Sequence, residues 1–207
     1  MANMEDVLDL YALPLDTSHP QVCFDERPVQ LLGDVYKPLP AQSGQVRRYD
    51  YEYKRNGTAN LCVMCQPLAG WREVKVTERR TKVDFAHCMK DLVDVHFPDA
   101  VVIRVVLDNL NTHTFGALYE AFSPDEARRI ARKLEFHYTP KHGSWLNMAE
   151  IEISILSRQC LKQRVGDYSQ LQTVTHSWTQ RRNEQKITIN WDFDVTKART
   201  KLSRLYP

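Results

Sequence analysis

The chain has 207 residues, a length that suits one domain, and 43% of them are hydrophobic, enough to bury a core around a central sheet. Its 28 basic and 26 acidic residues leave a net charge of only +2, so charge balance alone does not argue for a nucleic-acid partner. No apolar run is long enough to span a membrane, and the N-terminus is acidic where a signal peptide would be basic. These features argue against a membrane or exported protein and predict a cytosolic one.

The first half of the chain has the pattern of strands followed by a helix. Residues 21–33 mix aliphatic and polar side chains over the length of a strand. Residues 49–67 alternate on both sides of Asn56-Gly57, and because Asn-Gly is a strong turn signal we expect an antiparallel hairpin there. Residues 71–80 resemble a further strand, and residues 84–97 carry apolar side chains near helical spacing.

The second half begins with the most strongly β-branched segment, residues 100–109, which is typical of a central strand covered on both faces. Ser123-Pro124 has the composition of a capped helix start. A short strand over 134–140 and helices over 145–161 and 169–185 follow. This order predicts an α/β fold, with a mixed central sheet flanked by helices.

Two acids fall at unusual positions in the predicted strands. Asp25 interrupts an apolar strand, and Asp108 ends the apolar run of residues 101–107. A buried carboxylate without a partner is costly, so such acids usually have a cation, a capping role or a metal. A cap or an ion pair is the commoner explanation for one such acid, but two of them on strands that can be neighbours favour a functional site.

A third acid comes from the helix predicted after Trp145. Glu150 and Glu152 are two positions apart and point to nearly opposite sides, so only one of them can face a shared site. Glu150 continues a polar stripe with Asn147 and Ser154, which favours it over Glu152. Three converging carboxylates repel one another unless divalent cations bridge them, and two such ions can support phosphodiester cleavage and transfer.

Three segments carry a resemblance to a known family. FDERPVQLL, VLDNLNTHT and HGSWLNMAEIEISILSRQCL resemble the DDE transposases of bacterial insertion sequences related to the mariner superfamily. Matched by motif, Asp25, Asp108 and Glu150 take the positions of the three catalytic, metal-binding acids of that family. The resemblance runs over nearly the whole chain, from about Met4 onward.

The resemblance implies an RNase H-like, retroviral-integrase-like fold with Mg²⁺ or Mn²⁺ as cofactor, two ions in all. It implies cleavage at transposon ends and strand transfer into target DNA, with double-stranded DNA as the partner, a homodimer as the working form, and the bacterial cytosol as the location. Full-length relatives recognise transposon ends with a helix-turn-helix segment. We expect that segment on a separately encoded partner or on an N-terminal part.

The expected organisation has a lead-in segment at 1–20, the catalytic domain at 21–190 and a basic C-terminal tail at 191–207. We expect His113 to order the loop after Asp108 or to contact DNA, although a helix-capping role is open. Trp145 can stack on a base, but core packing is the favoured interpretation. The candidate nucleic-acid contacts are His113, His142, Trp145, Asn147, Arg128, Arg129 and Arg132.

Two other patterns have ordinary structural explanations. Cys62 and Cys65 form a lone CxxC, but strand-like alternation puts them on opposite faces, so buried thiols are favoured over a zinc or redox site. A second group of basic residues is a candidate phosphate contact or a solvated surface. It comprises Arg47, Arg48, Lys54 and Arg55.

Two rival functions remain open. A metal-dependent nuclease would use water for every step and never join strands, and the acids alone do not separate it from a transposase. A noncatalytic DNA-binding remnant of a transposase would tolerate the loss of Asp108, whereas an enzyme would not.

Overall fold

The computed structural model describes residues 1–36, 39–46, 48 and 51–206. Its centre is a five-stranded sheet in the order β3-β2-β1-β4-β5, in which β1 pairs antiparallel with β2 and parallel with β4. The predicted mixed sheet is therefore confirmed. The strands are β1 (Gln21–Asp34), β2 (Tyr53–Gln66), β3 (Trp71–Thr77), β4 (Ile103–Leu107) and β5 (Leu134–Tyr138).

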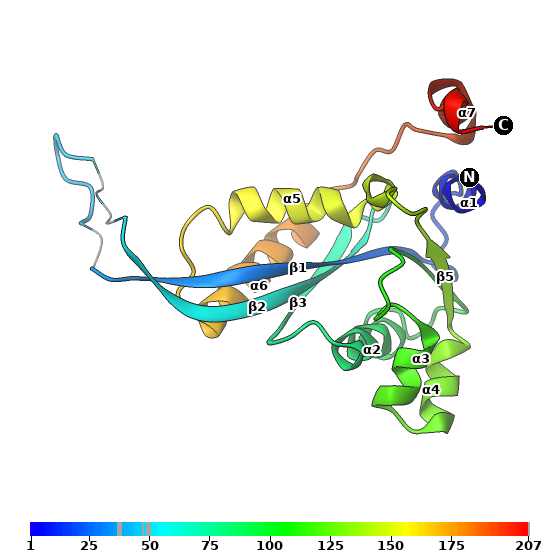
Figure 1. The fold of residues 1–207 in the computed structure, drawn as a ribbon, viewed down its shortest axis with the longest axis horizontal. Coiled ribbons are helices and arrows are strands. Elements are labelled where there is room, and N and C mark those ends of the chain that lie inside the picture. The colour runs from blue at the N-terminus through cyan, green and yellow to red at the C-terminus, as the bar shows by residue number, and fades with distance from the viewer. Residues whose placement is uncertain (37–38, 47, 49–50, 207) are drawn as a thin grey trace.

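Helices cover both faces of this sheet (Figure 1). One face carries α2, α3 and α4, while α1, α5 and α6 lie on the other. A π-helical turn, Leu92–His96, extends α2, and a 3-10 turn, Ser144–Leu146, precedes α5. The helices are α1 (Ala2–Tyr11), α2 (Lys82–Asp91), α3 (Phe115–Ala121), α4 (Pro124–Ala131), α5 (Ala149–Gln159), α6 (Tyr168–Glu184) and α7 (Val195–Lys201).

Strand alternation divides the side chains of the central strands between two cores. Val22 and Phe24 of β1 are fully buried in the core beneath α2 and α3, whereas Cys23 between them is buried in the core beneath α1 and α5. Cys62 and Cys65 of β2 are divided in the same way and are free thiols on opposite faces. The prediction of a central strand covered on both faces is confirmed, since β4 joins both cores.

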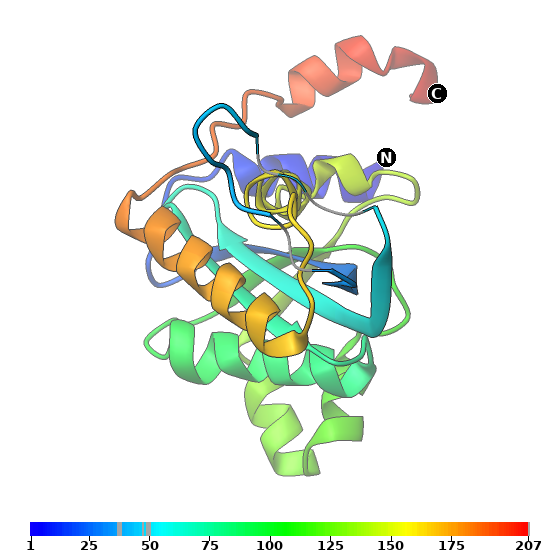
Figure 2. The ribbon, with the colours of Figure 1, turned by 90° about the vertical axis from the view of Figure 1, so that its left-hand side faces the viewer.

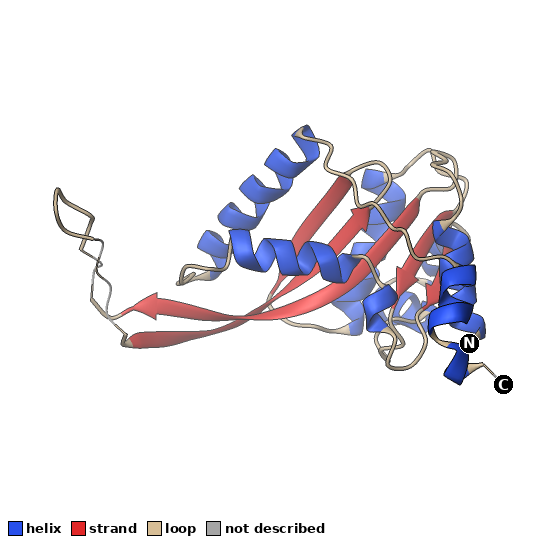
Figure 3. Cartoon of the chain, turned by 90° about the horizontal axis from the view of Figure 1, so that it is seen from above, coloured by secondary structure: helices blue, strands red, loops and turns tan. Residues whose placement is uncertain are grey.

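The hairpin predicted at Asn56-Gly57 is wrong. β2 runs through these residues, and β1 and β2 form a long arm that extends away from the helices (Figures 1 and 3). The register passes from Gln30 opposite Thr58 to Leu32 opposite Arg55, so Asn56 and Gly57 together face one residue of β1. Gly57 has a φ of +102°. The glycine therefore serves a β-bulge, which strengthens the local twist, and not a turn.

Other elements differ from expectation in their extent. Helix α3 was not predicted, and the helix expected from residue 145 begins at Ala149 because the 3-10 turn precedes it.

Helix α7 packs near α1, where Arg199 pairs with Glu5 at 2.8 Å. On the arm, Arg48, Lys54 and Arg55 are exposed, whereas Arg47 lies outside the described residues. No helix among the described residues has the length and hydropathy of a transmembrane span.

Candidate active site

The three acids come from adjacent elements at one end of the central strands. Cys23 of β1 is paired with Val106 of β4, so the same register carried two residues further sets Asp25 beside Asp108. Cys23 and Val106 both belong to the core beneath α1 and α5, and strand alternation turns Asp25 toward that same face. Glu150, in the first turn of α5, lies over this face. Parallel pairing and the position of α5 thus bring the acids together.

The charges of the three acids interact. Burial, with a smaller contribution from the nearby carboxylates of Glu150 and Asp108, raises the pKa of Asp25 to about 6. A hydrogen bond that the backbone N–H of Glu26 donates to Asp25 at 2.7 Å opposes this rise but does not cancel it. The acids therefore form a cluster in which negative charge is only partly compensated.

The start of α5 is fixed to β1 next to Asp25. The Asn147 side chain is 1% exposed, and its Nδ2 donates to the carbonyl oxygen of Phe24 at 2.7 Å. Its Oδ1 accepts a hydrogen bond from the backbone N–H of Ala149 at 3.1 Å. Both ends of the amide thus bond to the chain itself, and they set the position of the turn that carries Glu150.

Glu152 lies on the opposite side of α5 from the cluster. It is fully buried, and its Oε1 lies 2.9 Å from an Arg182 nitrogen and 3.3 Å from an Arg72 nitrogen. Glu150 is exposed and has no ion pair within the part of the chain that the structure describes. Of these two glutamates, only Glu150 presents its carboxylate to the cluster.

A buried histidine connects the cluster to a fourth acid. His113 is 1% exposed, and its Nδ1 lies 2.6 Å from Oδ1 of Asp108, while its Nε2 lies 3.5 Å from Oε2 of Glu26. Burial alone would lower the pKa of His113, but its bonds to Asp108 and Glu26 outweigh burial and raise that pKa to about 9. The same contact with His113 lowers the pKa of Asp108.

Sequence reasoning overlooked Glu26. The available signal was strand alternation, which puts Glu26 on the same face as Val22 and Phe24, where an acid is unexpected. The structure does not give His113 the alternative role of capping a helix. The N-cap residue of α3 is Thr114, and no side chain caps the start of that helix. His113 instead orders the loop by contacting Asp108, and its backbone carbonyl accepts the Tyr138 hydroxyl at 2.8 Å.

The donor set fits a hard divalent cation. Asp25, Asp108 and Glu150 offer carboxylate oxygens, the ligands that Mg²⁺ and Mn²⁺ prefer. Among the described residues, no group of three or more His, Cys, Asp and Glu side chains is arranged to hold a metal ion. The charges of the three acids interact, but their oxygen atoms are not already arranged as a metal-coordination site. One oxygen of Asp108 is bound to His113.

Other candidate contacts have varied surroundings. His142 is exposed with a φ of +63°. Core packing of Trp145 is a wrong prediction, because the residue is 47% exposed and its ring meets that of Phe193 edge-on, with the ring centroids 5.5 Å apart. On α4, Arg129 is held by Asp94 and Glu126, whereas Arg128 and Arg132 make no ion pair within the described residues.

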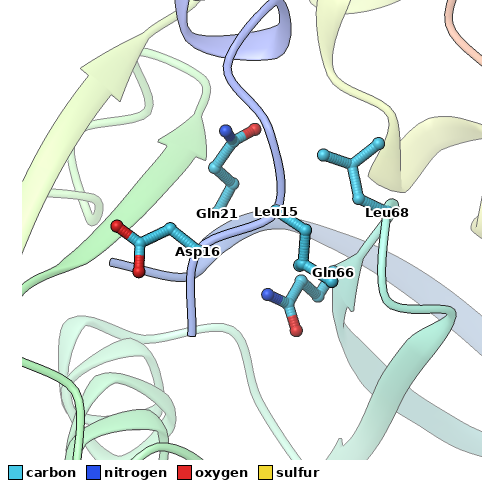
Figure 4. Close-up of a pocket in the computed structure, with 5 residues that line it drawn as sticks. All are labelled: Leu15, Asp16, Gln21, Gln66 and Leu68. Atoms are coloured by element: carbon cyan, nitrogen blue, oxygen red, sulfur yellow. The ribbon is translucent and has the colours of Figure 1, made fainter. Parts of the chain in front are cut away.

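A separate small cavity lies at the start of β1 (Figure 4). With a volume of about 10 Å³ it has room for roughly one water molecule, far less than a small-molecule site requires. Its one acid, Asp16, already accepts hydrogen bonds from the Ser18 backbone and the His19 ring. The cavity lining consists of Leu15, Asp16, Gln21, Gln66 and Leu68.

A mixed sheet with acids at its two parallel central strands and a third acid on a covering helix defines the class of RNase H-like domains. Residues 20–172 match the family described as DDE superfamily endonuclease. Because this match covers well over half of the sequence, the chain belongs to the DDE superfamily endonucleases.

Solved structures of the Mos1 mariner transposase share the fold, which confirms the RNase H-like prediction. The Mos1 paired-end complex with Mn is 17% identical with a TM-score of 0.57 over 90% of this chain and 56% of that one. The Mos1 strand transfer complex is 15% identical with a TM-score of 0.59, covering 90% and 55%. The paired-end complex with Mg is 16% identical with a TM-score of 0.53, covering 90% and 59%. The chain thus spans little more than half of Mos1.

A search of curated protein sequences found no match. The family assignment therefore comes from the match over residues 20–172, and the fold assignment from the Mos1 structures.

Proposed function

We propose that this chain is the catalytic domain of a transposase that cleaves phosphodiester bonds at transposon DNA ends and joins the resulting 3′-hydroxyl to target DNA. The observation that carries the proposal is the cluster of Asp25, Asp108 and Glu150, in which burial and, to a smaller extent, the neighbouring carboxylates raise the pKa of Asp25 to about 6. Such a cluster costs stability unless cations neutralise it.

In this proposal, Asp25, Asp108 and Glu150 hold two Mg²⁺ or Mn²⁺ ions. Bound there, the ions would neutralise charge on the phosphate and acidify the attacking water or hydroxyl. His113 occupies one oxygen of Asp108 and so fixes the direction of the other. Asn147 holds the start of α5 against β1 and keeps Glu150 near Asp25.

Further parts of the proposal follow from family membership and from the Mos1 complexes, whose names include paired ends and strand transfer. Double-stranded DNA is the substrate, the working form is a homodimer in the bacterial cytosol, and residues 21–190 carry the catalysis. A helix-turn-helix segment on a partner or an N-terminal part recognises the ends. His142 and Trp145, both exposed before α5, are proposed DNA contacts, as are Arg128 and Arg129 on α4 and Arg132 at its C-terminal end.

The test is metal-dependent cleavage of a labelled DNA duplex by the intact chain and by Asp108→Asn. We expect cleavage with Mn²⁺ or Mg²⁺ and a loss of at least about a hundredfold in the variant, since each of these acids would stabilise charge in the transition state. Asp9→Asn, which removes an exposed acid of α1, is the matched control and should cleave like the intact chain. Cleavage that survives in Asp108→Asn would contradict the proposal.

A second assay separates a transposase from a plain nuclease. A pre-cleaved duplex with a free 3′-hydroxyl is incubated with circular target DNA, and joined products are scored. Joining supports strand transfer, whereas cleavage without joining identifies a metal-dependent nuclease. A noncatalytic remnant would bind DNA and give neither product, with or without Asp108.

A further inference from the structure

A basic cavity lies away from the acidic cluster, between the C-terminal end of α5, the connection after it, and α6. Figures 2 and 3 show α5 and α6 side by side on one face of the sheet. The cavity has a volume of about 450 Å³, and none of the described residues that line it is acidic. Its cationic lining residues, which we call the basic groove, are Arg158, Lys162, Arg164 and Arg181.

Three of these cations have no counter-charge in the part of the chain that the structure describes. Arg164 pairs with Asp34 at 2.9 Å and also donates to the carbonyl oxygen of Glu52, so it is engaged in holding the arm. Arg158, Lys162 and Arg181 are exposed, and none of them has an acidic partner among the described residues. Like charges gathered without anions repel one another, so the groove is more stable with an anionic partner.

The rest of the lining indicates which anion fits. Gln163 adds a side-chain amide, a group that commonly donates to phosphate oxygens, whereas Thr173 and Ser177 already donate their hydroxyls to backbone carbonyl oxygens of α6. Among the described lining residues the aromatic one is Trp178, which is 1% exposed and whose Nε1 donates to Gln159 at 2.7 Å. The described lining therefore offers no ring for stacking on an unpaired base, which favours the phosphates of a duplex over a single strand.

The basic groove is also within reach of the acidic cluster. Arg158 follows Glu150 by eight residues of α5, a rise of about 12 Å, or roughly three to four base pairs of B-form DNA. Between them, Arg27 lies on the same face of β1 as Asp25 and donates to the Ser157 hydroxyl at 2.6 Å. A cationic path thus leads from the acids to the groove.

We propose that the basic groove binds the phosphates of a DNA duplex a few base pairs from the phosphodiester bond that reacts. The contacts are to the backbone and are independent of base sequence. The identity of the anion rests on the proposed function, because that function makes DNA the substrate. The groove positions DNA and takes no part in bond cleavage.

The test is the salt dependence of binding to a fluorescent duplex, measured by anisotropy in EDTA. The variant Arg158→Gln/Lys162→Gln/Arg181→Gln should bind at least about tenfold more weakly and lower the slope of log affinity against log salt by about 2 to 3. The control removes three cations that are ion-paired elsewhere, on α2 and β4. It is Lys82→Gln/Lys90→Gln/Arg104→Gln, and its slope should stay near that of the intact chain.

Equal losses in the two triple variants would overturn the inference, because they would reflect net charge alone. Displacement of the duplex by polyglutamate at matched charge would also overturn it, since the groove would then favour an acidic protein segment. Because the assay contains no metal, its result is separate from the cleavage test. If the intact chain cleaves DNA but the groove variant keeps its salt slope, only the inference about the groove is contradicted. If the groove variant loses binding but the intact chain does not cleave DNA, only the proposed enzyme activity is contradicted.

Discussion

Glu150 and Glu152 lie two residues apart on α5 and have opposite surroundings. Glu152 is fully buried between Arg72 and Arg182, so its charge is compensated within the fold. Glu150 is exposed and adds its charge to those of Asp25 and Asp108. Two acids in one helical turn can thus have different roles. An acid with a buried counter-charge stabilises the fold, whereas an acid without one is available to the site.

The largest expected effect tests the scaffold side of this comparison. Glu152→Gln should lower the free energy of unfolding by about 3–5 kcal/mol, because it leaves Arg72 and Arg182 buried without their anion. Glu150→Gln is the matched variant and should leave stability unchanged or raise it, since it relieves repulsion. Denaturant unfolding measures both. Equal losses would mean that the two glutamates do not differ in role.

The second prediction concerns the pH dependence of the metal-free protein. The pKa of Asp25 in the folded state, about 6, exceeds its ordinary value of 3.8, so folding favours the protonated form. Stability should therefore fall as pH rises from about 4 through 6, by at most about 3 kcal/mol from this residue. Melting curves of the intact chain and Asp25→Asn should diverge over this interval. Parallel pH profiles would contradict the raised pKa.

A third, smaller effect comes from His113. His113→Gln should lower stability by about 1–3 kcal/mol, since it removes a charged hydrogen bond to Asp108 and an ion pair with Glu26. The folded pKa of about 9 lies above the ordinary 6.5, so this stabilisation is fully present below about pH 6.5 and is lost as pH rises through 9. The difference in the free energy of unfolding between the intact chain and His113→Gln, measured in urea, should become smaller from pH 6 to pH 10. A gap independent of pH would show that His113 acts through packing alone.

The smallest effect on stability is expected at Trp145, which lies in the 3-10 turn before α5. Trp145→Ala should lower stability by less than about 1 kcal/mol, because the residue is 47% exposed. Trp178 of α6, which is 1% exposed, is the contrasting residue, and Trp178→Ala should lower the free energy of unfolding by about 3–5 kcal/mol. Thermal unfolding of the two variants gives the comparison. A large loss at Trp145 would indicate a core role.

Much of the fold could be predicted because hydrophobic patterns are local. The β-branched run that became β4 and the Ser123-Pro124 start of α4 were both evident in sequence. Asn56-Gly57 was misleading, since a glycine with positive φ suits a bulge as well as a turn. Which of these occurs depends on pairing with β1, and that pairing is a long-range property.

The site could be predicted in part for the same reason. Asp25 and Asp108 stood out because acids end or interrupt apolar runs, and helical spacing separated Glu150 from Glu152. Glu26 was missed, although it lies next to Asp25 in the chain. Its role depends on His113, a partner 87 positions away, and no local pattern joins the two.

The most direct test of the central claim is Mn²⁺ binding by titration calorimetry to the intact chain, Glu150→Gln and Glu184→Gln. Glu184, the exposed last residue of α6, is the control acid. If Asp25, Asp108 and Glu150 form the metal site, the intact chain and Glu184→Gln bind Mn²⁺ alike, and Glu150→Gln binds at least about tenfold more weakly. Equal binding by all three proteins would contradict the claim that these acids hold the metal.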